Sequence, residues 1–266
     1  MLRSELGLTF GRMRTRGLLI VLAVIPALLS LAVRLSGGPE GGRGPTFLDQ
    51  VSHNGVFAAL AGLTVVVPFF LPLTVSVVAG DTVAGEASLG TLRYLLVRPV
   101  GRTRFVLSKF GAAVVFCLVG ALAVAVTGLA VGWLFFPVGR VVTLSGTTIG
   151  AGQGVARALA AAAVVGASMI GLAAVGVLIS TFTESPVGAI AATTGVAIFS
   201  QVLDAIPQLH AIHPLLLTHG WLSFGDLMRS PVAWGNIGQD LLIQACWTGL
   251  FMLAAWARMT TRDVLG

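Results

Sequence analysis

Six long apolar runs, separated by short polar segments, dominate the chain. They cover residues 17–35, 56–79, 110–136, 157–182, 186–203 and 237–257. A helix needs about 20 mostly apolar residues to cross the hydrocarbon core of a bilayer, and each run is near or above that length. Strands of a membrane β-barrel would instead alternate apolar and polar residues, which runs such as AALAGLTVVVPFFLPLTVSVVAG do not. The pattern predicts an all-α, polytopic membrane protein with six transmembrane helices.

Composition agrees with this class. The 266 residues are 56% hydrophobic and 10% charged, with a mean hydropathy of +0.96, whereas soluble domains average roughly 25% charged residues. The formal net charge is +6, but the arginines lie at the ends of apolar runs rather than on one basic face. This placement favours membrane lipid over nucleic acid as a partner. We expect residues 1–266 to form a single transmembrane domain.

The distribution of Lys and Arg predicts the orientation, because cytoplasmic loops retain more positive charge. With the N-terminus inside, eleven of the sixteen cations fall on the inner side: Arg3, Arg12, Arg14, Arg16, Arg93, Arg98, Arg102, Arg104, Lys109, Arg258 and Arg262. The other five fall on the outer side: Arg34, Arg43, Arg140, Arg157 and Arg229. We therefore expect a multi-pass protein of the cytoplasmic (inner) membrane, with both termini and residues 80–109 in the cytoplasm.

Two segments outside the runs have amphipathic character. Before the first run, Leu2, Leu6, Phe10 and Met13 recur at helical spacing among arginines, which predicts an interfacial helix. Between the last two runs, residues 204–236 are rich in proline and aromatic residues: Pro207, Pro214, Trp221, Phe224, Pro231 and Trp234. We interpret 204–236 as broken amphipathic helices that re-enter the outer interface, held there by tryptophans. An ordinary surface loop is the alternative.

Several catalytic and transport chemistries are missing. A P-loop needs a lysine directly after glycine, and the only lysine, Lys109, lies in LSKFG. We therefore expect no ATP hydrolysis by this chain and no other enzymatic activity. Ser168, in GASMIG, fits a packing residue better than a nucleophile, because no histidine lies in any apolar run. The centres of the runs carry no ionisable group, which disfavours proton-driven transport, although sodium sites built from backbone carbonyls would leave no such trace.

The four histidines all fall on the predicted outer side. His210, His213 and His219 form the spacing H-x-x-H-x-x-x-x-x-H, which could suit zinc or copper. No acidic or thiolate residue accompanies them closely in the sequence, and ligands on a loop need supporting contacts. We therefore interpret them, together with His53, as interfacial or loop histidines and expect no bound metal.

Residues 80–109 read GDTVAGEASLGTLRYLLVRPVGRTRFVLSK and hold five of the sixteen cations. Apolar residues recur there at helical spacing, namely Leu89, Leu92, Leu95 and Leu96. Pro99 cannot continue that helix, and a second helix is expected to run from Arg102 through Lys109 into the third span. The segment is thus predicted to form a helical hairpin between spans 2 and 3. Positive-inside anchoring does not require Asp81 or Glu86, so the hairpin is interpreted as presenting both signs of charge to a cytoplasmic partner.

This segment resembles the first cytoplasmic loop of the type-2 permeases of ATP-binding-cassette (ABC) exporters. The shared pattern is an acidic residue, a glutamate, Gly-Thr-Leu-Arg, a proline and a basic stretch that ends in lysine. Its members here are Asp81, Glu86, Gly90, Thr91, Leu92, Arg93, Pro99, Arg102 and Lys109. The layout of the whole chain is also similar, but the motif covers only this loop. The tail ARMTTRDVLG departs from the family, since its TTRD has one arginine where two cations are common.

The resemblance implies a permease subunit that forms a homodimer or pairs with a similar permease and binds two copies of a separate ABC ATPase. ATP and Mg would be bound by that ATPase and no cofactor by this chain. It further implies that the ATPase couples to the spans through Asp81, Glu86, Gly90, Thr91, Arg93, Pro99 and Arg102. The outer loops are too small to capture a substrate, which favours export over import.

The sequence gives fewer signals for the transport path and its cargo than for the coupling segment. Candidate path-lining groups are the uncharged polar residues within the runs: Thr64, Thr74, Thr127, Thr193, Thr194, Ser200 and Gln244. Such hydroxyls also bond back to their own helix. Neutral spans suggest an amphipathic or hydrophobic cargo. The alternatives are a membrane anchor or assembly subunit without a path, and a channel, which should show regular polar stripes that we do not find.

Overall fold

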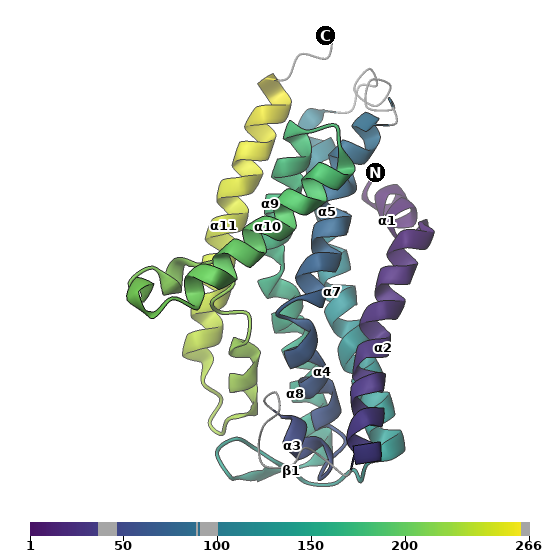
Figure 1. Ribbon diagram of the computed structural model, residues 1–266, viewed down its shortest axis with the longest axis vertical. Helices are drawn as coiled ribbons and strands as arrows, with labels where there is room; N and C mark the ends of the chain where they lie inside the picture. Colours follow the sequence, from purple (N-terminus) through teal and green to yellow (C-terminus); the bar gives the residue numbers. More distant parts are fainter. Residues whose placement is uncertain (37–46, 89, 91–100, 262–266) are drawn as a thin grey trace.

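The computed structural model describes residues 1–36, 47–88, 90 and 101–261. These residues form an elongated helical bundle whose long helices run along one axis (Figure 1). The helix α1 (Leu2–Gly11) and the last turns of α11 (Trp234–Thr261) lie at one end, called here the termini end. The short helix α3 (Leu48–Val51) and a two-stranded hairpin, β1 (Val141–Val142) with β2 (Thr148–Ile149), lie at the other, called the hairpin end.

Within the described residues, five helical segments are long and apolar enough to cross a membrane, and a bent helix pair brings the number to six. The predicted all-α, polytopic fold is therefore confirmed. The remaining long helices are α2 (Met13–Ser36), α4 (Phe57–Val66), α5 (Phe70–Ser88), α7 (Arg102–Phe135), α8 (Ala151–Ser168), α9 (Ile170–Phe182) and α10 (Pro186–Asp204). The α8 and α9 helices together form one of the five spanning segments. The predicted N-terminal helix is α1.

The bent pair is α4 and α5, which meet at an angle of 59°. Pro68 lies between them and has no N–H group to continue a helix, so the break has a local cause. The carbonyl of Pro68 accepts a hydrogen bond of 2.6 Å from the side-chain nitrogen of Gln201 on α10. A broken helix is tolerated inside a membrane where a neighbouring element satisfies the freed backbone groups in this way.

Small residues allow the helices to approach closely. A Cβ atom at Gly128 of α7 would lie 2.6 Å from the Cα atom of Ala59 on α4, closer than atoms can pack. Only glycine therefore fits where these two helices cross. The α9 helix packs against both α5 and α11, and α7 packs against α2, α4 and α8. The spans thus form one continuous core around α7 and α9.

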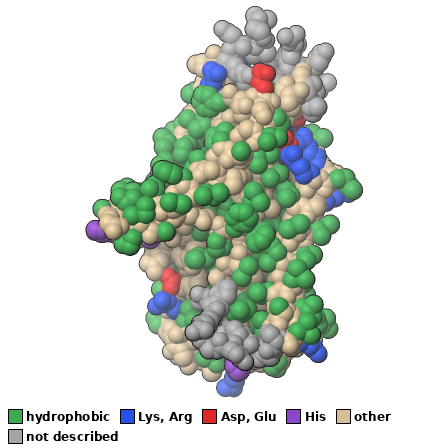
Figure 2. Space-filling view, in the orientation of Figure 1, with side chains coloured by type: hydrophobic (Ala, Val, Ile, Leu, Met, Phe, Trp, Pro, Cys, Tyr) green, Lys and Arg blue, Asp and Glu red, His purple; other side chains and the backbone are tan. Residues whose placement is uncertain are grey.

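The surface separates into an apolar middle and charged ends. Figure 2 shows hydrophobic side chains over most of this face, while Lys, Arg, Asp and Glu side chains gather toward the two ends. Large apolar residues such as Leu28, Leu122 and Leu253 are exposed on the spanning helices. Lipid is the solvent that accommodates such a surface, as the predicted multi-pass membrane protein requires.

The segment 204–236 folds back along the bundle. It contains three short 3-10 helices: η2 (Pro207–Leu209), η3 (His213–Leu215) and η4 (Ser223–Met228). Thr218 hydrogen-bonds Ser200 of α10 at 2.9 Å between the two hydroxyl oxygens, which fastens the middle of the segment to a span. Trp221 is only 2% exposed, so it packs in the core, whereas Trp234 is 65% exposed. Of these two tryptophans, only Trp234 has the exposure expected of an interfacial anchor.

The arrangement of the two ends generates a topology prediction. Single cysteines at Gly7 and Gly101 should react with a membrane-impermeant thiol reagent from the cytoplasmic side, and cysteines at Gly139 and Gly150 from the other side. All four glycines have open space around a Cβ atom, so the substitutions should not disturb packing. The background is a variant in which Cys117 and Cys246 are replaced by serine. Labelling of Gly101→Cys and Gly150→Cys from the same side would contradict the assignment.

Candidate functional site

The predicted coupling residues that the structure describes lie at the termini end. Asp81 and Glu86 are not in a loop, because α5 continues through residues 80–88. Gly90 follows with a positive φ of 68° and donates its N–H to the carbonyl of Ala87, a geometry that glycine adopts easily at the end of a helix. The α7 helix begins at Arg102, as predicted, and continues without interruption into the third span.

The remainder of the predicted hairpin lies outside the described residues. These positions are Leu89, Thr91, Leu92, Arg93, Leu95, Leu96 and Pro99. The structure therefore describes the two roots of segment 80–109, namely the end of α5 and the start of α7. Both roots carry charged side chains with partners elsewhere in the chain.

At the first root, Asp81 pairs with two arginines from the junction of α1 and α2. Arg12 Nη1 donates to Asp81 Oδ2, and Arg14 Nη2 lies 2.9 Å from the same oxygen. The Asp81 side chain is 11% exposed, whereas the arginines are 42% and 49% exposed. A nearly buried carboxylate needs such cationic partners, because transfer of an isolated charge out of water is costly. This arginine–aspartate cluster fixes the end of α5 against the N-terminal helices.

At the second root, Lys109 of α7 pairs with two carboxylates. Its Nζ atom lies 2.9 Å from Glu5 Oε2 on α1 and 3.1 Å from Glu86 Oε1 on α5. All three side chains are nearly buried, with exposed fractions of 6% for Lys109, 11% for Glu5 and 13% for Glu86. The ammonium group also lies 5.5 Å from the centroid of the Phe105 ring, a favourable cation–π distance. The lysine cluster thus joins three helices at one point.

A cavity of about 30 Å³ separates the two clusters and is lined by members of both, including Glu5, Arg12, Asp81 and Lys109. The space is sufficient for a water molecule among polar groups. The clusters are therefore adjacent parts of one polar site. We refer to this site, made of Glu5, Arg12, Arg14, Asp81, Glu86 and Lys109, as the root site.

Arg102 connects the start of α7 to the end of α11. Its Nη1 atom donates hydrogen bonds to the carbonyls of Met259, at 3.0 Å, and Thr260, at 2.7 Å. The carbonyl end of a helix carries partial negative charge, which favours a cation there. The indole nitrogen of Trp256 also donates to Thr103 Oγ1 at 2.9 Å. The C-terminal helix is therefore fastened to the same root of segment 80–109.

The structure shows how the candidate path-lining hydroxyls are bonded. Four of them donate to carbonyls of their own helices: Thr64 to Leu60, Thr74 to Leu71, Thr127 to Ala123 and Thr193 to Ala189. This is the bonding that the sequence analysis anticipated for some of the set. Thr194 Oγ1 is buried and has no hydrogen-bond partner among the described residues. Their role as path-lining groups stays a prediction.

Ser200 is bonded to Thr218, and Gln244 belongs to a buried polar network that the sequence did not predict. Gln244 donates to the carbonyl of Leu217 at 2.7 Å and to Asp240 Oδ1 at 3.3 Å, and Ser168 Oγ donates to Asp240 Oδ2. Asp240 is buried near the start of α11 and lines a pocket of about 320 Å³ with His219 and Gln239. The polar string GQDLLIQ at the start of the sixth run was the only signal of this network.

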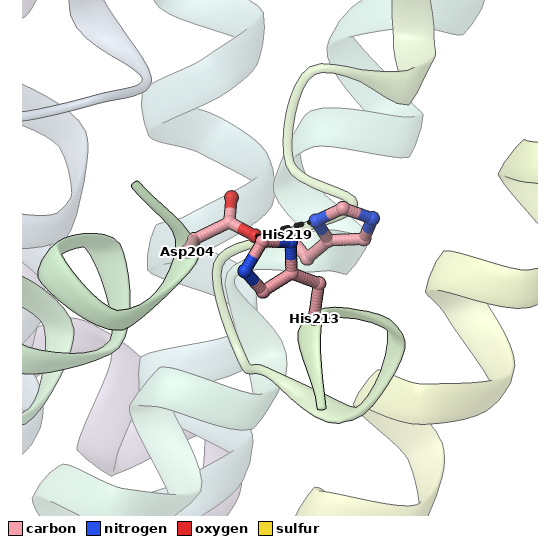
Figure 3. Close-up of side chains that lie close together, drawn as sticks. All are labelled: Asp204, His213 and His219. Carbon is pink, nitrogen blue, oxygen red and sulfur yellow. Dashed lines mark hydrogen bonds and ion pairs between the residues drawn. The ribbon is translucent and has the colours of Figure 1, made fainter. Parts of the chain in front are cut away.

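Two of the histidines that were predicted to lie on the outer side converge with an acidic residue. Asp204, His213 and His219 each offer one ligand atom, and these atoms all lie within 4.8 Å of one another. Figure 3 shows the three side chains pointing toward a common centre from the end of α10, the η3 turn and the following loop. His53 and His210 are not members of this group. One of the two reasons for expecting no metal was the lack of a nearby acidic ligand, and Asp204 supplies such a ligand.

The bundle, its apolar girdle and its charged ends define a polytopic helical membrane protein. The chain belongs to the family described as "Protein of unknown function (DUF2705)", whose model matches residues 19–265.

Two curated relatives specify the class more closely, and both are named "Probable ABC transporter permease protein NosY". The one from Pseudomonas aeruginosa is 35% identical over 92 residues, which are 35% of this chain and 31% of the relative. The one from Stutzerimonas stutzeri is 30% identical over 142 residues, which are 50% of this chain and 49% of the relative. The matches thus span half of the relatives' length or less. The resemblance to ABC permeases drawn from residues 80–109 is confirmed.

The lysine cluster generates a stability prediction. Lys109→Met should lower the free energy of unfolding by about 3–5 kcal/mol, because it removes a nearly buried cation that pairs with the carboxylates of Glu5 and Glu86. Arg104→Met is the matched control, since Arg104 is exposed on the first turns of the same helix and a surface change of this kind costs within about 0.5 kcal/mol. The measurement is denaturant unfolding in detergent micelles. In the Lys109→Met variant, the further substitutions Glu5→Gln and Glu86→Gln should restore much of the lost free energy of unfolding, because they remove the carboxylate charges that paired with Lys109. Equal stability of Lys109→Met and Arg104→Met would show that the cluster is not a structural link.

Proposed function

We propose that this chain is the permease subunit of an ATP-driven ABC exporter in the cytoplasmic membrane. Its relatives are named probable ABC transporter permeases, and segment 80–109 carries the pattern of the loop by which such permeases contact their ATPase. The sequence has a single lysine and no P-loop around it, so a separate subunit supplies ATP hydrolysis. Two copies of that ATPase, holding ATP and Mg, serve a homodimer of this chain or a pair with a similar permease.

In this proposal the termini end faces the cytoplasm. The root site holds Arg12, Arg14 and Lys109, three of the cations assigned to the inner side, and Arg102 lies at the same end, which agrees with the positive-inside distribution. The ATPase contacts segment 80–109, whose two roots are the ends of α5 and α7.

The observation that supports coupling most strongly is the bonding of both roots. Glu86 ties the end of α5 to Lys109 of α7, and Arg102 ties the start of α7 to the end of α11. A displacement of segment 80–109 would therefore move α5, α7 and α11 together, because its two roots are bonded to these helices. Discrete packed contacts of this kind are the physical means by which two distant sites become coupled.

The proposed cargo is amphipathic or hydrophobic and leaves through a path between the spans. The path would be lined by uncharged groups from the set that includes Thr194, Ser200 and Gln244. The described outer connections are short or folded back on the bundle, as residues 204–236 are, and so offer no substrate-capturing domain. This favours movement outward.

Substitution of Glu86 tests the proposed coupling between the ATPase and the spans. Glu86→Gln should leave the permease folded, because Lys109 retains Glu5, but should remove the ion pair that links the end of α5 to Lys109 of α7. In purified complexes, ATP with vanadate should change the labelling rate of Gly150→Cys, at the far end of the bundle, by about five-fold or more in the wild type. Glu86→Gln should remove most of that response while ATP hydrolysis continues.

Glu184→Gln is the control, a neutralised carboxylate in the exposed turn between α9 and α10, and should respond as the wild type does. A full response in Glu86→Gln would remove this residue from the coupling route. Failure of any azido-ATP-labelled subunit to copurify with the wild-type chain would contradict the proposed function itself.

A further inference from the structure

We propose that Asp204, His213 and His219 form a binding site for one divalent transition-metal ion of the zinc type. The inference concerns this chain alone, and it holds whether or not the proposed transport function is correct. The three side chains come from the end of α10, from η3 and from the loop that follows it. Each brings a donor atom that zinc commonly binds, two imidazole nitrogens and one carboxylate oxygen.

The distances between the three donor atoms would suit a bound zinc ion after small movements of the side chains. His219 Nδ1 lies 2.6 Å from Asp204 Oδ1, and His213 Nδ1 lies 3.8 Å from the same oxygen. Ligand atoms around a tetrahedral zinc ion, each at ~2.0–2.1 Å from it, are separated by about 3.3 Å. The observed separations lie on both sides of this value, so shifts of about one ångström would bring the three atoms to bonding distance.

His213 is oriented in the way that metal-binding histidines are. Its Nε2 atom lies 3.1 Å from the carbonyl oxygen of Ile206. A carbonyl can only accept, so Nε2 carries the proton in this contact, and Nδ1 is the nitrogen left on the Asp204 side to bind an ion. Ligating histidines almost always use their second nitrogen in this way, which fixes the ring orientation and raises the basicity of the ligating nitrogen.

The charge and accessibility of the site also favour a cation. Asp204 is the last residue of α10, where the helix carbonyls contribute partial negative charge. The side chains are partly accessible, at 29% for Asp204, 16% for His213 and 45% for His219, so an ion can enter from solution. With three protein ligands, at least one coordination position is left for water or another molecule.

A simpler arrangement uses the same groups without a metal. In it, His219 Nδ1 donates its proton to Asp204, and this bond adds to the Ser200–Thr218 hydrogen bond in fastening the loop to α10. Metal binding would replace that proton with the ion, releasing it to solvent, and would add His213 as a third ligand. The two arrangements therefore differ in stoichiometric metal content and in the participation of His213.

The test is zinc binding by the purified full-length chain, stripped of metal with a chelator and titrated calorimetrically with ZnCl₂. We expect one ion per chain, and an increase in Tm on adding zinc. His213→Asn, His219→Asn and Asp204→Asn should each weaken the affinity at least ~100-fold and abolish the rise in Tm. His53→Asn and His210→Asn are matched controls outside the cluster and should bind as the wild type does.

A second variant guards against loss of folding. His219→Cys keeps a zinc ligand at the same position and should retain binding, and its cobalt complex should show the thiolate charge-transfer band that the wild-type complex lacks. Wild-type binding well below one ion per chain, or undiminished zinc binding by the double variant His213→Asn/His219→Asn, would overturn the proposal. Unchanged Tm in the wild type on saturation with zinc would overturn it as well.

Discussion

One nearly buried ammonium group, that of Lys109, determines how the termini end of the bundle is assembled. It lies about 3 Å from carboxylates of α1 and α5, at 2.9 Å from Glu5 and 3.1 Å from Glu86. Each of these charges costs several kcal/mol to remove from water, so the three helices must meet where the charges can pair. Arg12 and Arg14 impose the same requirement on Asp81. The end of α5 is consequently fixed from two sides, and segment 80–109 leaves from a rigid root.

The consequences extend along the molecule through packing. The α5 helix packs against α9 and α10, α9 packs against α11, and Arg102 links α11 back to α7. In the proposed transporter, a displacement of the roots therefore reaches the spans through contiguous contacts. The region around the 204–236 segment is organised by a different set of groups. Gln244 of α11 donates to the carbonyl of Leu217, and Arg157 of α8 donates to the carbonyls of Leu227 and Arg229. There the hydrogen bonds serve to fold a loop back onto the spans.

Apolar periodicity was sufficient to predict the spans, α1 and the helix that begins at Arg102, because lipid forces every spanning segment into a helix. The charges of Asp81 and Glu86 indicated a polar site, but their partners could not be inferred. Asp81 pairs with residues 69 and 67 positions away, which only the packed bundle brings together. The same holds for Asp204, which precedes His213 in the sequence yet reaches it because η2 and η3 turn the chain back. The motif in 80–109 predicted the class of protein, which the relatives bear out.

The central claim is that the termini end receives an ATPase. The most direct measurement is site-specific photo-crosslinking in intact cells, with a benzophenone amino acid placed at Gly101 or at Gly150. Both glycines have open space around a Cβ atom. Gly101 directly precedes α7 at the termini end, and Gly150 directly follows β2 at the hairpin end. The account predicts that a subunit containing a P-loop is captured from Gly101 and not from Gly150. The claim would be contradicted if that subunit were crosslinked from Gly150. It would also be contradicted if no crosslink formed from Gly101 or from any neighbouring position of segment 80–109.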